Sequence, residues 1–203
     1  KIVSIIIPTL NSAQFLSRTL DSIFAQTYKE IEVILVDGGS TDETINIATK
    51  YNLKIIKTEG ERSTQKNLGA KNAKGEYLYF VDSDFILDPN IVSECVTKIG
   101  NVDMIAVHNT SDPKVSFWSR VRKFERDLLK YDRDNISPRF LKKTAFDAVN
   151  GFNAKLVAGE DYDIYNRLLA KNFKLGFIEA EEMHLGEPKN IRQIISKHLY
   201  YGQ

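Results

Sequence analysis

Cysteine is nearly absent from this sequence, in which Cys95 is the single example among 203 residues. One thiol cannot form an internal disulfide or a zinc site built from several cysteines. Cys95 shares an apolar helical pattern with Val92 and Val96, which predicts a buried position and a reducing compartment. We therefore expect the protein in the cytoplasm or at the cytoplasmic face of a membrane.

An excess of either charge is also missing, because 28 basic and 27 acidic residues leave a formal net charge of +1. Such a chain lacks the positive field typical of bulk nucleic-acid binding, so we expect no nucleic-acid partner. No run approaches the roughly 20 apolar residues of a membrane-spanning helix, and no leader-like segment opens the chain. Because it begins with Lys1 and stops after an amphipathic segment, we expect the natural protein to continue further.

What is present is a regular alternation of short apolar runs and helical patterns. Strands are predicted at about 2–7, 33–36, 54–57, 77–81 and 104–107, with helices between them. Ser40 and Glu43 have the spacing of a capping box, and Asp88-Pro89 predicts the cap and first residue of the next helix. Apolar runs without alternation indicate strands covered on both faces, so the predicted fold is α/β with a mostly parallel, doubly wound sheet.

The rhythm changes after residue 112. A helical pattern covers 117–130, and a polar stretch runs to Pro138. A short helix near Thr144, a turn at Gly151-Phe152 and a helix at 161–171 follow. Strands are predicted near 175–178 and 183–185, and a final helix starts at 190.

Polar residues follow three of the predicted strands. They are Pro8, Thr9 and Asn11 after the first strand, Asp37, Gly39 and Ser40 after the second, and Asp82, Ser83 and Asp84 after the strand that ends at Val81. Ligands of open parallel sheets bind outside the carboxyl ends of the strands, so these residues should converge on one site. Asp82 and Asp84 could bind a phosphate through Mg²⁺ or Mn²⁺. An ordinary acidic turn would use the same residues.

Asp37 is the second candidate for ligand contact. An acidic residue at a strand end can hydrogen-bond a base or a ribose, and the glycines beside it permit close backbone approach. A simple strand-to-helix turn explains Gly39 and Ser40 equally well. The glycine patterns of dinucleotide enzymes and P-loop NTPases do not occur.

Several motifs together resemble family 2 glycosyltransferases. Those that carry the resemblance are Ser4-Ile5-Ile6-Ile7-Pro8-Thr9-Leu10-Asn11, Val36-Asp37-Gly38-Gly39-Ser40-Thr41-Asp42, Lys66-Asn67-Leu68-Gly69-Ala70, Ala73-Lys74-Gly75-Glu76-Tyr77, Val81-Asp82-Ser83-Asp84, Gly151-Phe152 and Gly159-Glu160-Asp161. The similarity is strong over 1–110 and looser over 144–203. It implies one GT-A domain over 1–203, with a nucleotide-sugar half at 1–110 and an acceptor-side half at 111–203.

The resemblance also implies a reaction. The donor would be a UDP-, GDP- or dTDP-sugar, the cofactor Mn²⁺ or Mg²⁺, and the outcome inversion at the anomeric carbon. The acceptor would be a glycan or a lipid-linked group. The nucleotide-binding residues implied are Pro8, Thr9, Asn11, Asp37, Gly39, Lys66, Asp82 and Ser83. The resemblance implies Asp84 as a metal ligand and Asp161 as the catalytic base.

Two of these assignments have alternatives. Glu160 would orient Asp161 or cap its helix, and both acids also suit an ordinary charged helix start. His184 completes the metal site in the resemblance, but a hydrogen-bonded structural histidine is an equal alternative. The chain departs from the family at Gly38, where a second acid is frequent, and at Lys66, where arginine is frequent.

The amphipathic segments 117–130 and 190–203 carry basic residues beside their apolar stripes. Both predict either contact with a membrane surface or ordinary packing on the sheet. Two other functions compete with glycosyl transfer. One is a sugar nucleotidyltransferase, although the early loop Thr9-Leu10-Asn11-Ser12 lacks a Gly-rich, basic phosphate grip. The other is a binding module without turnover.

Overall fold

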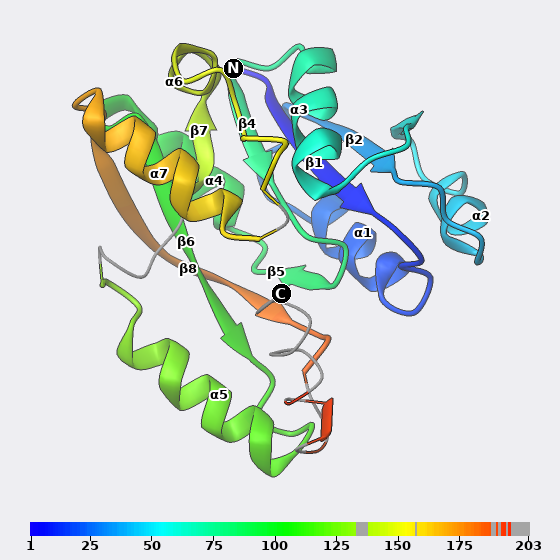
Figure 1. Cartoon of the computed structure of the whole chain (residues 1–203). Helices are drawn as coiled ribbons and strands as arrows, with labels where there is room; N and C mark the ends of the chain where they lie inside the picture. Colours follow the sequence, from blue (N-terminus) through cyan, green and yellow to red (C-terminus); the bar gives the residue numbers. More distant parts are fainter. Residues whose placement is uncertain (133–137, 157, 188–189, 191, 194, 196–203) are drawn as a thin grey trace.

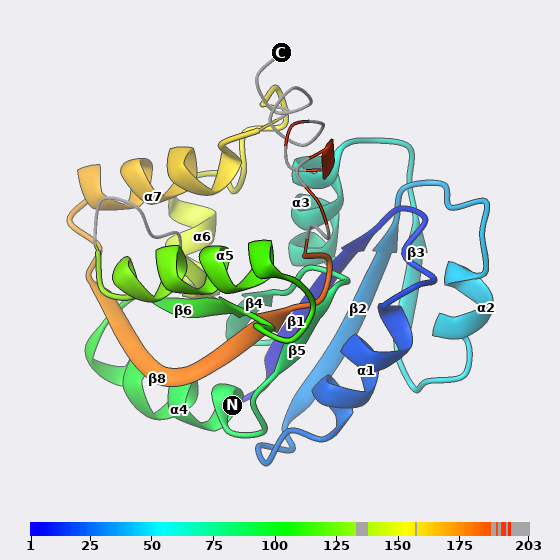
Figure 2. The ribbon, with the colours of Figure 1, turned by 90° about the horizontal axis from the view of Figure 1, so that it is seen from below.

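The computed structural model describes residues 1–132, 138–156, 158–187, 190, 192–193 and 195. One eight-stranded sheet, in the order β3-β2-β1-β4-β7-β6-β8-β5, crosses this part of the chain. Helices cover both of its faces (Figures 1 and 2). The structure thus confirms the predicted α/β class.

The first half is a parallel unit. Strands β1 (Val3–Thr9), β2 (Ile31–Asp37), β3 (Lys54–Lys57) and β4 (Tyr77–Phe80) run the same way. They are joined through α1 (Leu16–Phe24), α2 (Thr44–Ala48) and α3 (Arg62–Asn72). The parallel register brings the ends of β1 and β2 level, because Thr9 pairs with Asp37.

The second half completes the same sheet with a mixed unit. Its elements are β5 (Phe85–Leu87), α4 (Ile91–Lys98) with a 3₁₀ turn at Ile99–Asn101, β6 (Met104–Ser111), α5 (Phe117–Leu128), β7 (Pro138–Lys142), α6 (Lys143–Ala148), α7 (Glu160–Ala170) and β8 (Leu175–His184). β7 is antiparallel to β4 and β6, and β5 is antiparallel to β8. The sheet is therefore mostly, and not wholly, parallel.

The core lies on both faces of β1, as expected for an apolar run without alternation. Ile5 and Ile7 pack with α1 and α4, whereas Ile6 packs on the opposite face with α3, α6 and α7. All seven residues of β1 are buried. Cys95 is fully buried within the first of these clusters, as its apolar pattern predicted.

Local details of the prediction are corrected by the structure. Ser40 and Glu43 form no capping box, because the Ser40 hydroxyl hydrogen-bonds Asp37 and α2 begins at Thr44 without a side-chain cap. Asp88 accepts a hydrogen bond from the Asn90 amide in a turn, and α4 begins only at Ile91. β5 and β7 were not predicted, and the two strands expected between 175 and 185 form the single strand β8.

Helix α5 packs along β6 at the end of the sheet away from α2 (Figure 1). Ser116 caps it, accepting from the Ser119 amide. The predicted helix from 190 falls largely outside the described residues, as does His198. Within the described ranges no helix is long and apolar enough to cross a membrane.

Candidate active site

A cleft of about 720 Å³ lies at the carboxyl ends of β1, β2 and β4. Seven residues predicted for the site line it: Pro8, Thr9, Asn11, Asp82, Ser83, Asp84 and His184. Arg62, Arg126 and Arg139 line it too. The lining thus combines three guanidinium groups with the three carboxylates of Glu61, Asp82 and Asp84.

Thr9 and Asp37 hold the first two strand ends together. Asp37 is 1% exposed, and its Oδ2 accepts from the amides of Gly39 and Ser40 at 3.1 and 3.0 Å. Its Oδ1 accepts from the hydroxyls of Ser40 and Thr9 at 2.5 and 3.3 Å. The carboxylate therefore fixes the shape of the loop that follows β2. Each of its two oxygens already accepts two hydrogen bonds.

Asn11 and Ser83 connect the neighbouring loops. Asn11, in a left-handed conformation, accepts from the Thr41 amide at 2.9 Å through its side chain. The Ser83 hydroxyl lies 2.8 Å from that of Ser12, and the Ser83 carbonyl accepts from Thr19 at 2.9 Å. The three strand-end loops thus form one hydrogen-bonded rim.

Asp82 is paired with Arg139, a residue of β7. Both terminal nitrogens of Arg139 lie 3.1 Å from Asp82 Oδ2, and its Nε lies 3.5 Å from Glu182 Oε1. Burial opposes ionisation of Asp82, but Arg139, Arg62 and Lys66 outweigh it and lower its pKa. Burial raises the pKa of Glu182 to about 7, although Arg139 opposes that shift.

Asp84 takes a different partner, His184. Asp84 Oδ2 lies 3.1 Å from His184 Nε2, while His184 Nδ1 lies 2.9 Å from Glu187 Oε1. Glu187 in turn contacts Ser111 at 2.6 Å and Arg126 at 2.8 Å. Gly186 permits this packing, because a Cβ there would lie 2.8 Å from Asp84 Oδ2.

The Asp84 and His184 pair suits a divalent cation. A carboxylate oxygen and an imidazole nitrogen meet at one point, and a carboxylate on the other ring nitrogen is the usual support of a ligating histidine. No group of three or more His, Cys, Asp or Glu ligands occurs in the described part of the chain. A cation held by this pair would therefore need oxygens of the substrate or water to complete its coordination.

Lys66, predicted to contact the nucleoside, lies beside two acids of α7. Its Nζ is 3.1 Å from Glu160 Oε1 and 2.9 Å from Asp161 Oδ1, and it lies 4.7 Å from the centre of the Phe152 ring. The next residue, Asn67, hydrogen-bonds both the carbonyl and the amide of Phe152, at 2.8 and 2.9 Å. Two consecutive residues of α3 therefore bind the segment that leads into α7.

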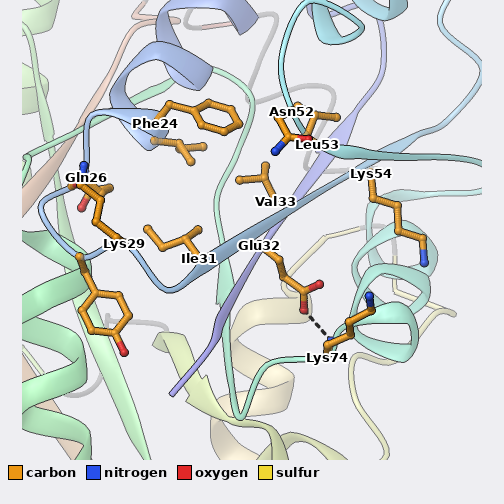
Figure 3. A pocket seen from close by; sticks show the side chains of 12 residues that line it. Phe24, Gln26, Lys29, Ile31, Glu32, Val33, Asn52, Leu53, Lys54 and Lys74 are labelled. Carbon is orange, nitrogen blue, oxygen red and sulfur yellow. Dashed lines mark hydrogen bonds between the residues drawn. The ribbon is translucent and has the colours of Figure 1, made fainter.

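A second cleft, of about 560 Å³, lies at the amino ends of β2 and β3 (Figure 3). Ile31, Val33, Leu53 and Phe24 contribute apolar surface, and Glu32 accepts from the Lys74 amide beside them. Among the described residues, no member of the predicted site lines this cleft. The cleft at the carboxyl ends is therefore the candidate site.

Comparison with known proteins agrees with this geometry. Residues 4–157 match the model of the family described as Glycosyl transferase family 2. The chain belongs to glycosyl transferase family 2.

The relatives in the family are much longer proteins than this chain. An uncharacterized glycosyltransferase of Rickettsia felis is 33% identical over 191 residues, covering 83% of this chain and 31% of the relative. A Rickettsia prowazekii homologue is 41% identical over 110 residues, which is 51% of this chain and 35% of that protein. Chondroitin synthase of Pasteurella multocida is 27% identical over 180 residues, covering 82% and 19%. The chain thus spans about a third of the Rickettsia proteins.

Solved structures of glycosyltransferases share the fold. S. aureus TarS 1-349 in complex with UDP-GlcNAc matches with a TM-score of 0.76 and 23% identity, over 94% of this chain and 60% of that TarS fragment. The mannosyltransferase PcManGT from Pyrobaculum calidifontis, in complex with GDP-Man and Mn²⁺, matches with a TM-score of 0.76 and 17% identity, over 95% and 59%. The expected GT-A fold is confirmed.

Several residues of the site were not found from sequence. Arg139, Arg126, Glu182 and Glu187 line or support the cleft. None of them belongs to a motif, and Arg139 lies on a strand that the polar run before Pro138 concealed. Arg139 reaches the cleft only because the sheet order places β7 beside β4.

Proposed function

We propose that this chain transfers a sugar from a nucleoside diphosphate to an acceptor hydroxyl, with a divalent cation and inversion at the anomeric carbon. One observation carries the proposal: the Asp84 and His184 pair shares a cleft with three arginines at the carboxyl ends of the strands. That combination suits a diphosphate leaving group. The complexes of TarS with UDP-GlcNAc and of PcManGT with GDP-Man support a nucleotide-sugar donor.

Asp161 supplies the base in this proposal. It is 28% exposed at the start of α7, and Lys66 holds its Oδ1 at 2.9 Å. Among the described residues, Asp161 does not line the cleft, whereas Arg139 does. Burial opposes protonation of the Arg139 guanidinium, but Glu182, Asp82 and Asp161 together raise its pKa. An acceptor hydroxyl between Asp161 and the donor would lose its proton to this carboxylate.

In the proposed reaction the acceptor oxygen displaces the diphosphate in a single step. The acceptor oxygen forms its bond to the anomeric carbon as the bond from that carbon to the diphosphate oxygen breaks. The diphosphate leaves with the electron pair, and Arg126 and Arg139, which line the cleft, would help to neutralise it. A bound Mn²⁺ or Mg²⁺ would add charge neutralisation at the same oxygens.

Asp161→Asn tests the role of the base. General-base catalysis contributes roughly 10²- to 10⁴-fold in rate, so transfer should fall by that factor while donor affinity changes little. Asp163→Asn is the matched control on the same helix, because Asp163 pairs with Arg167 at 2.6 Å. Release of nucleoside diphosphate, and not pyrophosphate, separates glycosyl transfer from nucleotidyl transfer. Wild-type rates in Asp161→Asn would exclude it as the base, and Glu160 would be the next residue to test.

Helix α5, in the half predicted to bind the acceptor, has an exposed apolar face. Val121, Phe124 and Leu128 of α5 face outward, the last two 67% and 69% exposed. Arg120 and Arg122 lie beside this stripe, and Arg126 of the same helix reaches the cleft. We propose that α5 contacts an anionic membrane surface, which would bring a lipid-linked acceptor to the site at the cytoplasmic face.

A further inference from the structure

Gln65 is a buried polar residue to which the mechanism gives no role. It lies on α3, is 4% exposed and lines the cleft at the carboxyl ends. Its Nε2 donates to the Gly60 carbonyl at 3.0 Å. Because a carbonyl can only accept, this bond fixes which end of the amide is the nitrogen. Oε1 is buried and has no hydrogen-bond partner among the described residues.

Gly38 creates the space for this amide. A Cβ at position 38 would lie 2.4 Å from Gln65 Nε2 and 3.3 Å from its Cδ. The Gln65 side chain therefore occupies the volume that a larger residue after Asp37 would take. Position 38 therefore cannot carry an acid while the Gln65 amide keeps this place.

The carboxylate of Asp37, the residue before Gly38, already accepts four hydrogen bonds. Its Oδ1 accepts from the hydroxyls of Thr9 and Ser40, and its Oδ2 accepts from the amides of Gly39 and Ser40. Asp37 is also missing from the residues that line the cleft in the described part of the chain, whereas Gly38 and Gln65 are among them. Next to Asp37, Gln65 therefore offers the cleft a buried acceptor, Oε1, that has no hydrogen-bond partner in the described part of the chain. A buried acceptor left unpaired is costly, which favours a ligand that donates to it.

We propose that Gln65 Oε1 selects the base of the donor by accepting a ring N–H. Uracil and thymine carry such a hydrogen on N3 and guanine on N1, whereas cytosine and adenine present a lone pair at the same ring position. A fixed acceptor thus favours the first three bases and repels the other two. The inference rests on the proposed function, because it takes the cleft to bind a nucleoside diphosphate.

Calorimetry with matched nucleotide pairs tests the proposal. UDP against CDP, and GDP against ADP, are compared with Mn²⁺ present on the wild type and Gln65→Met, which keeps the length but removes the acceptor. The wild type should prefer UDP to CDP or GDP to ADP by about tenfold or more, and Gln65→Met should reduce that ratio to near one. Gly38→Ala should do the same by displacing the amide, and it serves if Gln65→Met does not fold. Lys71→Met, on the exposed face of α3, is the control and should keep the wild-type ratio.

The outcomes separate the two proposals. If no nucleoside diphosphate binds the wild type, the proposed function itself fails. If a nucleotide binds and the preference survives in both Gln65→Met and Gly38→Ala, donor binding stands and Gln65 is not the selector. A wild type that prefers CDP or ADP would also overturn the inference.

Discussion

Replacing Lys66 by methionine should expose how much the acidic cluster depends on one cation. The Lys66 side chain is 3% exposed and that of Glu160 is 7% exposed, so neither can be rehydrated without opening the fold. At an effective dielectric constant of 20, charges about 3 Å apart attract by about 5 kcal/mol before desolvation is subtracted. Removing one partner of a buried pair typically costs about 3 to 5 kcal/mol.

Glu160 and Asp161 should contribute unequally to the loss of stability in Lys66→Met. Asp161 is 28% exposed and can regain water, so most of the loss should come from Glu160. We expect Lys66→Met to lower the free energy of unfolding by about 3 kcal/mol in urea denaturation. Adding Glu160→Gln to Lys66→Met removes the stranded charge and should restore at least half of the loss. A loss below about 1 kcal/mol, or no recovery in the double variant, would refute this reasoning.

Three further predictions follow from other parts of the structure. Asp84→Ala should abolish the tightening of nucleoside diphosphate binding by Mn²⁺ in calorimetry, and an unchanged metal effect would move the metal elsewhere. Phe124→Ser with Leu128→Ser should reduce co-sedimentation with anionic vesicles at low salt, whereas Leu169→Ser on α7 should not; equal binding by both would leave α5 without this role. Asp103 accepts from the Lys174 amide and from Lys142 Nζ, each at 3.0 Å, and these contacts outweigh burial and lower its pKa. Its contribution is therefore full above the unfolded pKa of about 4 and is lost as pH falls through the folded value. Asp103→Asn should cost about 1 kcal/mol at pH 7 and flatten the stability profile below pH 4 in thermal melts; parallel profiles would contradict the assignment.

The sequence predicted the first half of the fold well because β1 and β4 are fully buried and β2 is buried over most of its length. A run such as 2–7 has no polar alternation, and the residue after it must lie at a strand end, so Thr9, Asp37 and Asp82 could be placed near one another from periodicity alone. The cleft confirms that convergence for Thr9 and Asp82. Their roles toward a donor stay predictions.

The remainder depended on contacts distant in sequence. Lys66 and Glu160 are 94 positions apart, and no local pattern shows that a lysine of α3 pairs with the start of α7. Arg139 required the antiparallel pairing of β7 with β4, which hydrophobic periodicity does not specify. Glu187 lacked a signal because its partners come from α5, β6 and β8.

Three consecutive residues of α3 face three different parts of the molecule. Gln65 lines the cleft at the carboxyl ends of the strands, Lys66 pairs with the acids of α7, and Asn67 hydrogen-bonds the backbone of Phe152. This helix packs mainly on β1 and β2 of the first half, and Lys66 and Asn67 connect it to the second half. In a chimera of two family members, a crossover near residue 110 would therefore separate Lys66 and Asn67 from the residues of the second half that they contact.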